Sequence, residues 1–148
     1  MNVTDLARGA PPRWSDAVEG VVWLPRLAMK ARAHDAGMLG SYLFGQSPVD
    51  DEFLKTAGVS YAEFLALVRR VPDDADVLAA LGEASPGAID RLRLWSIEMP
   101  VRRRIFLRLL DLDDGYERPA WLNLPAAVIG TGLKPLMAVV RLVRPLKA

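Results

Sequence analysis

The sequence predicts an all-α fold, a compact bundle of six or seven short helices. Apolar residues recur along most of the chain at the three- and four-residue spacings of one helix face, while the strict alternation of a half-buried strand is missing. Capping residues and prolines mark repeated helix starts. The chain has 148 residues, 51% hydrophobic and 25% charged, a composition typical of one globular domain with its own core. One short extended segment near residues 20–23 stays open.

The first helix is expected to begin at Pro25, because proline lacks the N–H that a first helical turn needs least. It should run to about Met38, where Gly37 and Gly40 interrupt the helical pattern. Residues 1–19 contain glycine and paired prolines. These residues are therefore expected to form a flexible leader.

Capping signals place the later helices. Two serine–proline pairs, at residues 47–48 and 85–86, each supply an N-cap followed by a favourable first helical residue. Ser60 and Glu63 have the spacing of a capping box, and Gly58 is placed to end the helix before it. The expected helices cover about residues 48–57, 60–70, 73–81, 85–99, 101–112 and, in the tail, 133–143.

Charge is spread unevenly along the chain, although the net charge is only +1. Residues 47–90 carry three basic and nine acidic residues, whereas residues 118–148 carry five basic residues and no acid. We expect a helical domain over residues 20–117, followed by a basic amphipathic extension over 118–148 that packs on it. Within the extension, residues 133–148 suit a core or docking helix, which we favour, and also weak contact with an anionic membrane surface.

The residue types present exclude several kinds of site. The chain has no cysteine and one histidine, so disulfides, thiolate chemistry and a transition-metal site are not expected, and no cofactor is implied. Residues 111–117 are rich in aspartate, but their spacing does not match a calcium-binding EF-hand loop. The N-terminus has no apolar signal region and no uncharged run has the length of a membrane span. We therefore expect a soluble, cytoplasmic protein.

A set of motifs in the first half of the chain is similar to a known family. It begins with Leu24-Pro25-Arg26 and Lys30-Ala31-Arg32. Its further members are Gly37, Leu39-Gly40, Tyr42, Gly45, Asp51 and Phe53-Leu54. With these motifs, residues 20–117 or so resemble a family of small bacterial proteins known only as a domain of unknown function. The resemblance implies no particular activity.

The expected first helix and the turn after it carry the best candidate site. Arg26, Lys30 and His34 are spaced four residues apart and form one stripe, and Arg32 lies on another side of the helix. Beside the glycine-rich turn, these cationic groups can hold a carboxylate or phosphate, with Arg26 supplying a two-pronged donor. In this hypothesis Tyr42 lines the same small pocket.

Asp51 is the acid expected to orient one of these cations. The alternative for Arg26 and Lys30 is a solvent-exposed helix face, with Tyr42 as a half-buried core residue. For His34, the alternative to acid–base chemistry is a partly buried structural histidine. Both interpretations of this segment stay open.

Three functions are compatible with the sequence. The preferred one is a small binding or interaction module that holds a small anionic ligand or a protein partner. The second is a small enzyme in which His34 and Tyr42 perform acid–base chemistry beside an arginine anchor. The third is association with a membrane surface or a nucleic acid through the basic C-terminal helix. The arginine run at residues 101–110 favours nucleic acid only weakly, because aspartates follow it at once.

Overall fold

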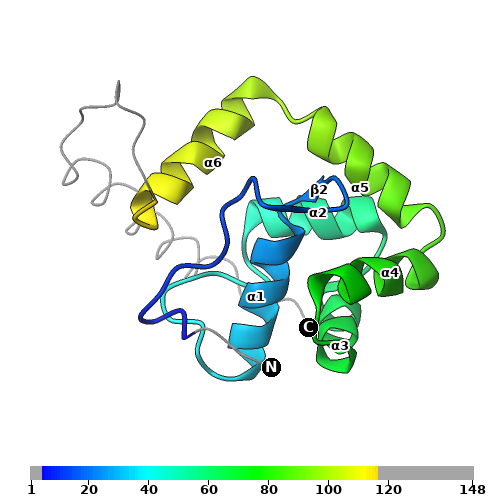
Figure 1. Ribbon diagram of the computed structural model, residues 1–148, viewed down its shortest axis with the longest axis horizontal. Helices are drawn as coiled ribbons and strands as arrows, with labels where there is room; N and C mark the ends of the chain where they lie inside the picture. Colours follow the sequence, from blue (N-terminus) through cyan, green and yellow to red (C-terminus); the bar gives the residue numbers. More distant parts are fainter. Residues whose placement is uncertain (1–4, 117–148) are drawn as a thin grey trace.

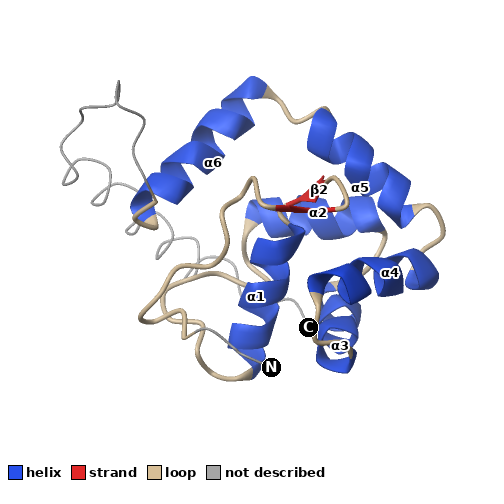
Figure 2. Ribbon diagram, viewed as in Figure 1, coloured by secondary structure: helices blue, strands red, loops and turns tan. Residues whose placement is uncertain are grey.

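A computed structural model describes residues 5–116 of the chain and confirms the all-α prediction. The part described contains six helices and one two-stranded antiparallel hairpin (Figures 1 and 2). The helices are α1 (Leu24–Asp35), α2 (Pro48–Ala57), α3 (Tyr61–Arg70), α4 (Asp74–Ala84), α5 (Ala88–Ile97) and α6 (Val101–Asp113). The strands are β1 (Ala17–Val18) and β2 (Val21–Val22).

Several of the predicted capping signals stand at helix boundaries, although the Ser47 side chain makes no capping hydrogen bond. Ser60 and Glu63 form the reciprocal capping box at the start of α3, with Glu63 N donating to Ser60 Oγ at 3.2 Å and Ser60 N donating to a Glu63 carboxylate oxygen at 2.7 Å. Gly58 ends α2 with a φ of 80°, as expected of a left-handed C-cap. Pro48 occupies the first turn of α2.

The second serine–proline pair was a wrong start signal. Helix α5 begins two residues after Pro86, at Ala88, and Gly87 stands at its N-cap with a φ of 75°. Helix α4 also runs through Gly82, where the sequence predicted an end, and closes at Ala84. A helix interior accepts a single glycine at a cost of about 1 kcal/mol. A Cβ at Gly82 would lie 2.9 Å from Ile89 Cδ1, so this position favours a residue without a side chain.

Helix α1 is central to the arrangement, with α3, α4 and β1 packed on it, while α2 packs on α5 (Figure 1). The largest fully buried side chains come from several elements and form one core. They include Trp23, Leu24, Leu27, Phe53, Phe64, Leu78, Leu81, Leu92 and Leu107. Helix α6 turns away from α5 and arches back toward the N-terminal half of α1, and it contributes only two buried side chains, Leu107 and Leu110.

Residues 5–19, expected as part of a flexible leader, lie against the helices. Leu6 is 3% exposed, and its N–H donates to the Met38 carbonyl at 2.9 Å. The extended segment that the sequence left open is β2, which pairs with β1 through a two-residue turn at Glu19 and Gly20. Both turn residues have positive φ, 47° and 84°, the geometry that suits the twist of a tight hairpin.

The expected tail helix, residues 133–143, lies outside the described residues, as does the whole basic extension over residues 118–148. Within residues 5–116, none of the helices has the length and apolar character needed to cross a bilayer. Most residues of the predicted site lie on α1 and in the loop that follows it.

Candidate functional site

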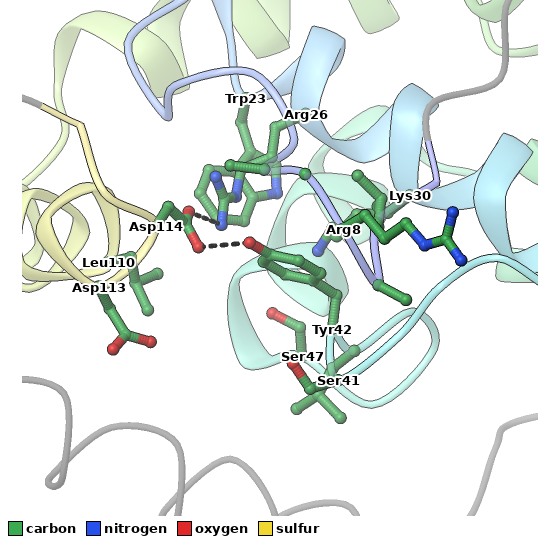
Figure 3. A pocket seen from close by; sticks show the side chains of 15 residues that line it. Arg8, Trp23, Arg26, Lys30, Ser41, Tyr42, Ser47, Leu110, Asp113 and Asp114 are labelled. Atoms are coloured by element: carbon green, nitrogen blue, oxygen red, sulfur yellow. Dashed lines mark hydrogen bonds and ion pairs between the residues drawn. The ribbon is translucent and has the colours of Figure 1, made fainter.

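A pocket of about 320 Å³ lies beside the N-terminal half of α1 (Figure 3). Its walls come from α1, the loop at residues 41–47, the N-terminal segment at 6–10 and the end of α6. The polar and charged side chains that line it are Arg8, Arg26, Lys30, Ser41, Tyr42, Ser47, Asp113 and Asp114. Segments far apart in the sequence thus meet at this pocket. Helix α1 contributes Arg26 and Lys30, two of the cationic residues of the predicted site.

Arg26 is buried at the wall of this pocket, with 3% of the residue exposed. Its Nη2 donates to Asp114 Oδ2 at 2.7 Å and its Nη1 donates to the Pro12 carbonyl at 2.9 Å. The guanidinium carbon lies 5.4 Å from the Trp23 ring centre and 5.8 Å from that of Tyr42. Two aromatic rings therefore flank the charge, and they stabilise it where water is excluded.

Tyr42 is directed at the same carboxylate. Its hydroxyl donates to Asp114 Oδ1 at 2.7 Å, so each oxygen of Asp114 accepts one strong hydrogen bond (Figure 3). Burial raises the pKa of Tyr42 above its usual value, and the hydrogen bond and negative charge of Asp114 raise it further. Tyr42 is therefore a hydrogen-bond donor at neutral pH and not a base.

The second cation, Lys30, is held in a fully buried ion pair. Its Nζ lies 2.7 and 2.6 Å from the two carboxylate oxygens of Asp50, and the Trp23 indole N–H donates to Asp50 Oδ1 at 2.9 Å. Burial lowers the pKa of Lys30 and raises that of Asp50, while their mutual attraction opposes both shifts. Asp50 thus orients the lysine, the role that the sequence analysis gave to its neighbour Asp51.

The other predicted site residues lie elsewhere. Arg32 pairs with Asp74 at 2.7 Å and lines a different pocket. The half-buried ring of His34 lies 5.2 Å from the ring of Phe44, and neither His34 nor Asp51 is among the residues that line the first pocket. Within the described part of the chain, the predicted set therefore divides into Arg26, Lys30 and Tyr42, which meet, and three residues that do not join them.

The alternative of a solvent-exposed face for Arg26 and Lys30 is wrong, since each residue is only 3% exposed. The sequence analysis missed Asp114, which it considered only as part of the aspartate-rich residues 111–117 that fail to match a calcium-binding loop. Asp111, three residues before Asp114, is also partly buried and accepts a hydrogen bond from Trp14 N at 3.2 Å. Between residues 5 and 116, no cluster of histidine and carboxylate side chains has the composition to hold a metal ion.

A family model described as a domain of unknown function (DUF5069) matches residues 11–104 of the chain. The chain belongs to this family. The matched range of the DUF5069 domain contains Arg26, Lys30, Tyr42 and Asp50 and ends inside α6, ten residues before Asp114. This match confirms the resemblance to a domain of unknown function that the sequence predicted. A search of curated proteins gave no match.

Proposed function

We propose that this protein is a binding module that holds a small carboxylate ligand at Arg26 and Tyr42. The observation that carries the proposal is the convergence of a buried guanidinium and a phenol on one carboxylate at the wall of a pocket. In the structure that carboxylate is the side chain of Asp114. Its position marks where the carboxylate of a ligand would accept the same two hydrogen bonds.

The surroundings suit such a ligand. The pocket volume of about 320 Å³ matches the lower end of small-molecule sites. Ser41, Ser47 and Arg8 add further polar groups for the rest of the molecule. A binding role is favoured over the enzyme alternative because Tyr42 lines the pocket without His34, so the expected acid–base pair does not face one molecule.

Asp114 lies at the end of a helix that contributes few side chains to the core. It follows the last residue of α6, a helix that buries only two side chains. A ligand carboxylate that displaces Asp114 gives Arg26 and Tyr42 an equivalent acceptor, and the freed aspartate then faces water at little cost. The ligand therefore competes with a side chain of the chain itself, and this competition favours ligands with additional contacts in the pocket.

The test begins with native mass spectrometry of the full-length chain purified gently from its own host, which detects a retained small molecule. The same protein is then titrated calorimetrically with mono- and dicarboxylates of two to six carbons. We expect saturable binding that Tyr42→Phe weakens by roughly tenfold or more, because one hydrogen bond to an ionised group contributes about 1.5–3 kcal/mol. Asp114→Asn is expected to strengthen binding, since an uncharged amide competes less well.

The matched control is Arg93→Met, which removes an exposed arginine that pairs with Glu19 away from the pocket. This variant should bind as the unchanged protein does. Folded protein that retains no molecule and binds none of the carboxylates would refute the proposal. Binding that Tyr42→Phe leaves unchanged would place the ligand elsewhere and refute it equally.

A further inference from the structure

A second pocket, of about 120 Å³, lies between the last turn of α1 and the second half of α3. Ala31, Leu65 and Val68 form an apolar wall, and Arg32 and Arg69 are the cationic residues of the lining. None of these residues lines the first pocket. The two cavities are therefore separate, although α1 contributes to both.

Arg32 is the unusual group of this second pocket because it is buried and incompletely paired. The residue is 7% exposed, and its Nη1 donates to Asp74 Oδ1 at 2.7 Å. Its Nε and Nη2 are buried and find no acceptor among the described residues. A buried donor without an acceptor loses its hydrogen bonds to water without replacement, so folded proteins rarely leave one unmatched.

The two unmatched donors belong to the same edge of the guanidinium group. Along this edge the Nε–H and one Nη2–H point in parallel, which is the geometry that binds both oxygens of a carboxylate. Asp74 engages Nη1, and the buried Nε–Nη2 edge has no acceptor among the described residues. The chemistry missing from the site is therefore one oxyanion with two acceptor oxygens.

The ion pairs at this pocket can rearrange when such an anion binds. Asp74 neutralises Arg32, and Arg69 pairs with Asp35, which also lines the pocket. The Arg69 and Asp35 side chains are 57% and 39% exposed, so solvent screens their ion pair and weakens it. Arg69 can therefore turn from Asp35 toward a bound anion and supply the second positive charge.

We propose that Arg32 binds a small carboxylate in this pocket, with the apolar part of the molecule against Ala31, Leu65 and Val68. The apolar wall favours a carboxylate with a short hydrocarbon part over inorganic phosphate, because phosphate would leave oxygens facing side chains that cannot donate to them. This second site is independent of the one at Arg26 and Tyr42.

The test observes the Arg32 Nε–H directly in ¹⁵N-correlated NMR spectra of the full-length protein. Isobutyrate, acetate and inorganic phosphate are added in separate titrations at constant ionic strength, with sodium chloride as the reference salt. We expect isobutyrate to shift the Arg32 resonance saturably and at lower concentration than acetate. Arg32→Lys retains the charge but not the two-pronged edge, and it should reduce isobutyrate affinity at least tenfold.

Two control variants separate this site from the others. Tyr42→Phe should leave the Arg32 titration unchanged, so failure at one pocket does not imply failure at the other. Arg93→Lys makes the same chemical change at an exposed arginine and should also leave it unchanged. Saturable shifts with phosphate but not with carboxylates would overturn the assignment. An Arg32 resonance that responds to no anion would also overturn it, because an ordered water would then be the acceptor.

Discussion

The buried pair of Lys30 and Asp50 allows a quantitative test of how this fold is held together. Their side chains are 4% and 0% exposed, and both carboxylate oxygens lie within 2.7 Å of the lysine Nζ. Lys30→Met removes the cation but leaves a buried carboxylate with the Trp23 indole N–H as its donor. Loss of one partner of such a pair costs about 3–5 kcal/mol, a large share of the roughly 5–15 kcal/mol that stabilises a domain.

The double variant Lys30→Met/Asp50→Asn measures how much of that loss comes from the stranded charge. Asparagine retains a carbonyl oxygen that accepts from Trp23 and carries no charge, so the double variant should recover most of the loss. We expect it to lie within about 2 kcal/mol of the unchanged protein. The assay is urea unfolding of all variants, followed by tryptophan fluorescence and far-ultraviolet circular dichroism.

The pH dependence of the single variant provides a second, independent check. Burial raises the pKa of Asp50 above its value in the unfolded chain, and removal of Lys30 raises it further. A group with a raised pKa in the folded state loses its contribution to stability as the pH rises. The deficit of Lys30→Met should therefore be larger at pH 8 than at pH 5. A deficit below about 1 kcal/mol that does not change with pH would refute the reasoning.

Three further changes have defined outcomes. Burial and Asp114 raise the pKa of Tyr42, so its contribution to stability is present below pH 10 and declines above it; unfolding curves from pH 9 to 11 should be steeper in pH for the unchanged protein than for Tyr42→Phe. Gly40→Ala should cost about 3–5 kcal/mol, because φ is +62° and a Cβ would lie 2.8 Å from Ala7 Cα, whereas Gly37→Ala, with φ +70° and open space, should cost about 1–2 kcal/mol in the same urea assay. Ser60→Ala removes the capping acceptor of α3 and should cost about 1 kcal/mol, with Ser41→Ala as a control.

The helices were predictable because their signals are local. The capping box at Ser60, the proline at the start of α2 and the left-handed glycine at residue 58 each act within one turn. The error at α5 arose from the same kind of signal, since Pro86 and Gly87 are both compatible with a helix start. Local chemistry there allows two boundaries two residues apart, and in the structure Ser85 Oγ accepts from Arg91 Nη2 at 2.9 Å and caps no helix N–H.

The candidate site was only half predictable because its acids are distant in sequence. The spacing of Arg26 and Lys30 along one helix placed them together, and Tyr42 follows shortly after. The acidic partners cannot be predicted from such spacing, because Asp50 is 20 residues from Lys30 and Asp114 is 88 residues from Arg26. A run of aspartates at a helix end looks solvated in sequence, because burial of one of them depends on where α6 points.

Helix α1 carries three buried cations, and each is neutralised by an aspartate from a different part of the chain. Arg26 pairs with Asp114 after α6, Lys30 with Asp50 of α2, and Arg32 with Asp74 of α4. Apolar side chains of similar volume would often stabilise a core as well as buried ion pairs do. The pairs join α2, α4 and the residue after α6 to defined positions on α1, so their loss is expected to affect how these elements are placed.

The three ion pairs differ in how many of their hydrogen-bonding groups have partners. This difference distinguishes a structural pair from the two proposed binding sites. The Lys30 ammonium contacts both oxygens of Asp50, which lines neither of the two pockets described above, as is typical of a structural pair. The acid on Arg26 stands at a pocket wall, beyond the range that the family shares. Arg32 retains two unmatched donors beside a second pocket. The two proposed ligand sites therefore lie at the arginines, where an external carboxylate would replace or complete what the chain supplies.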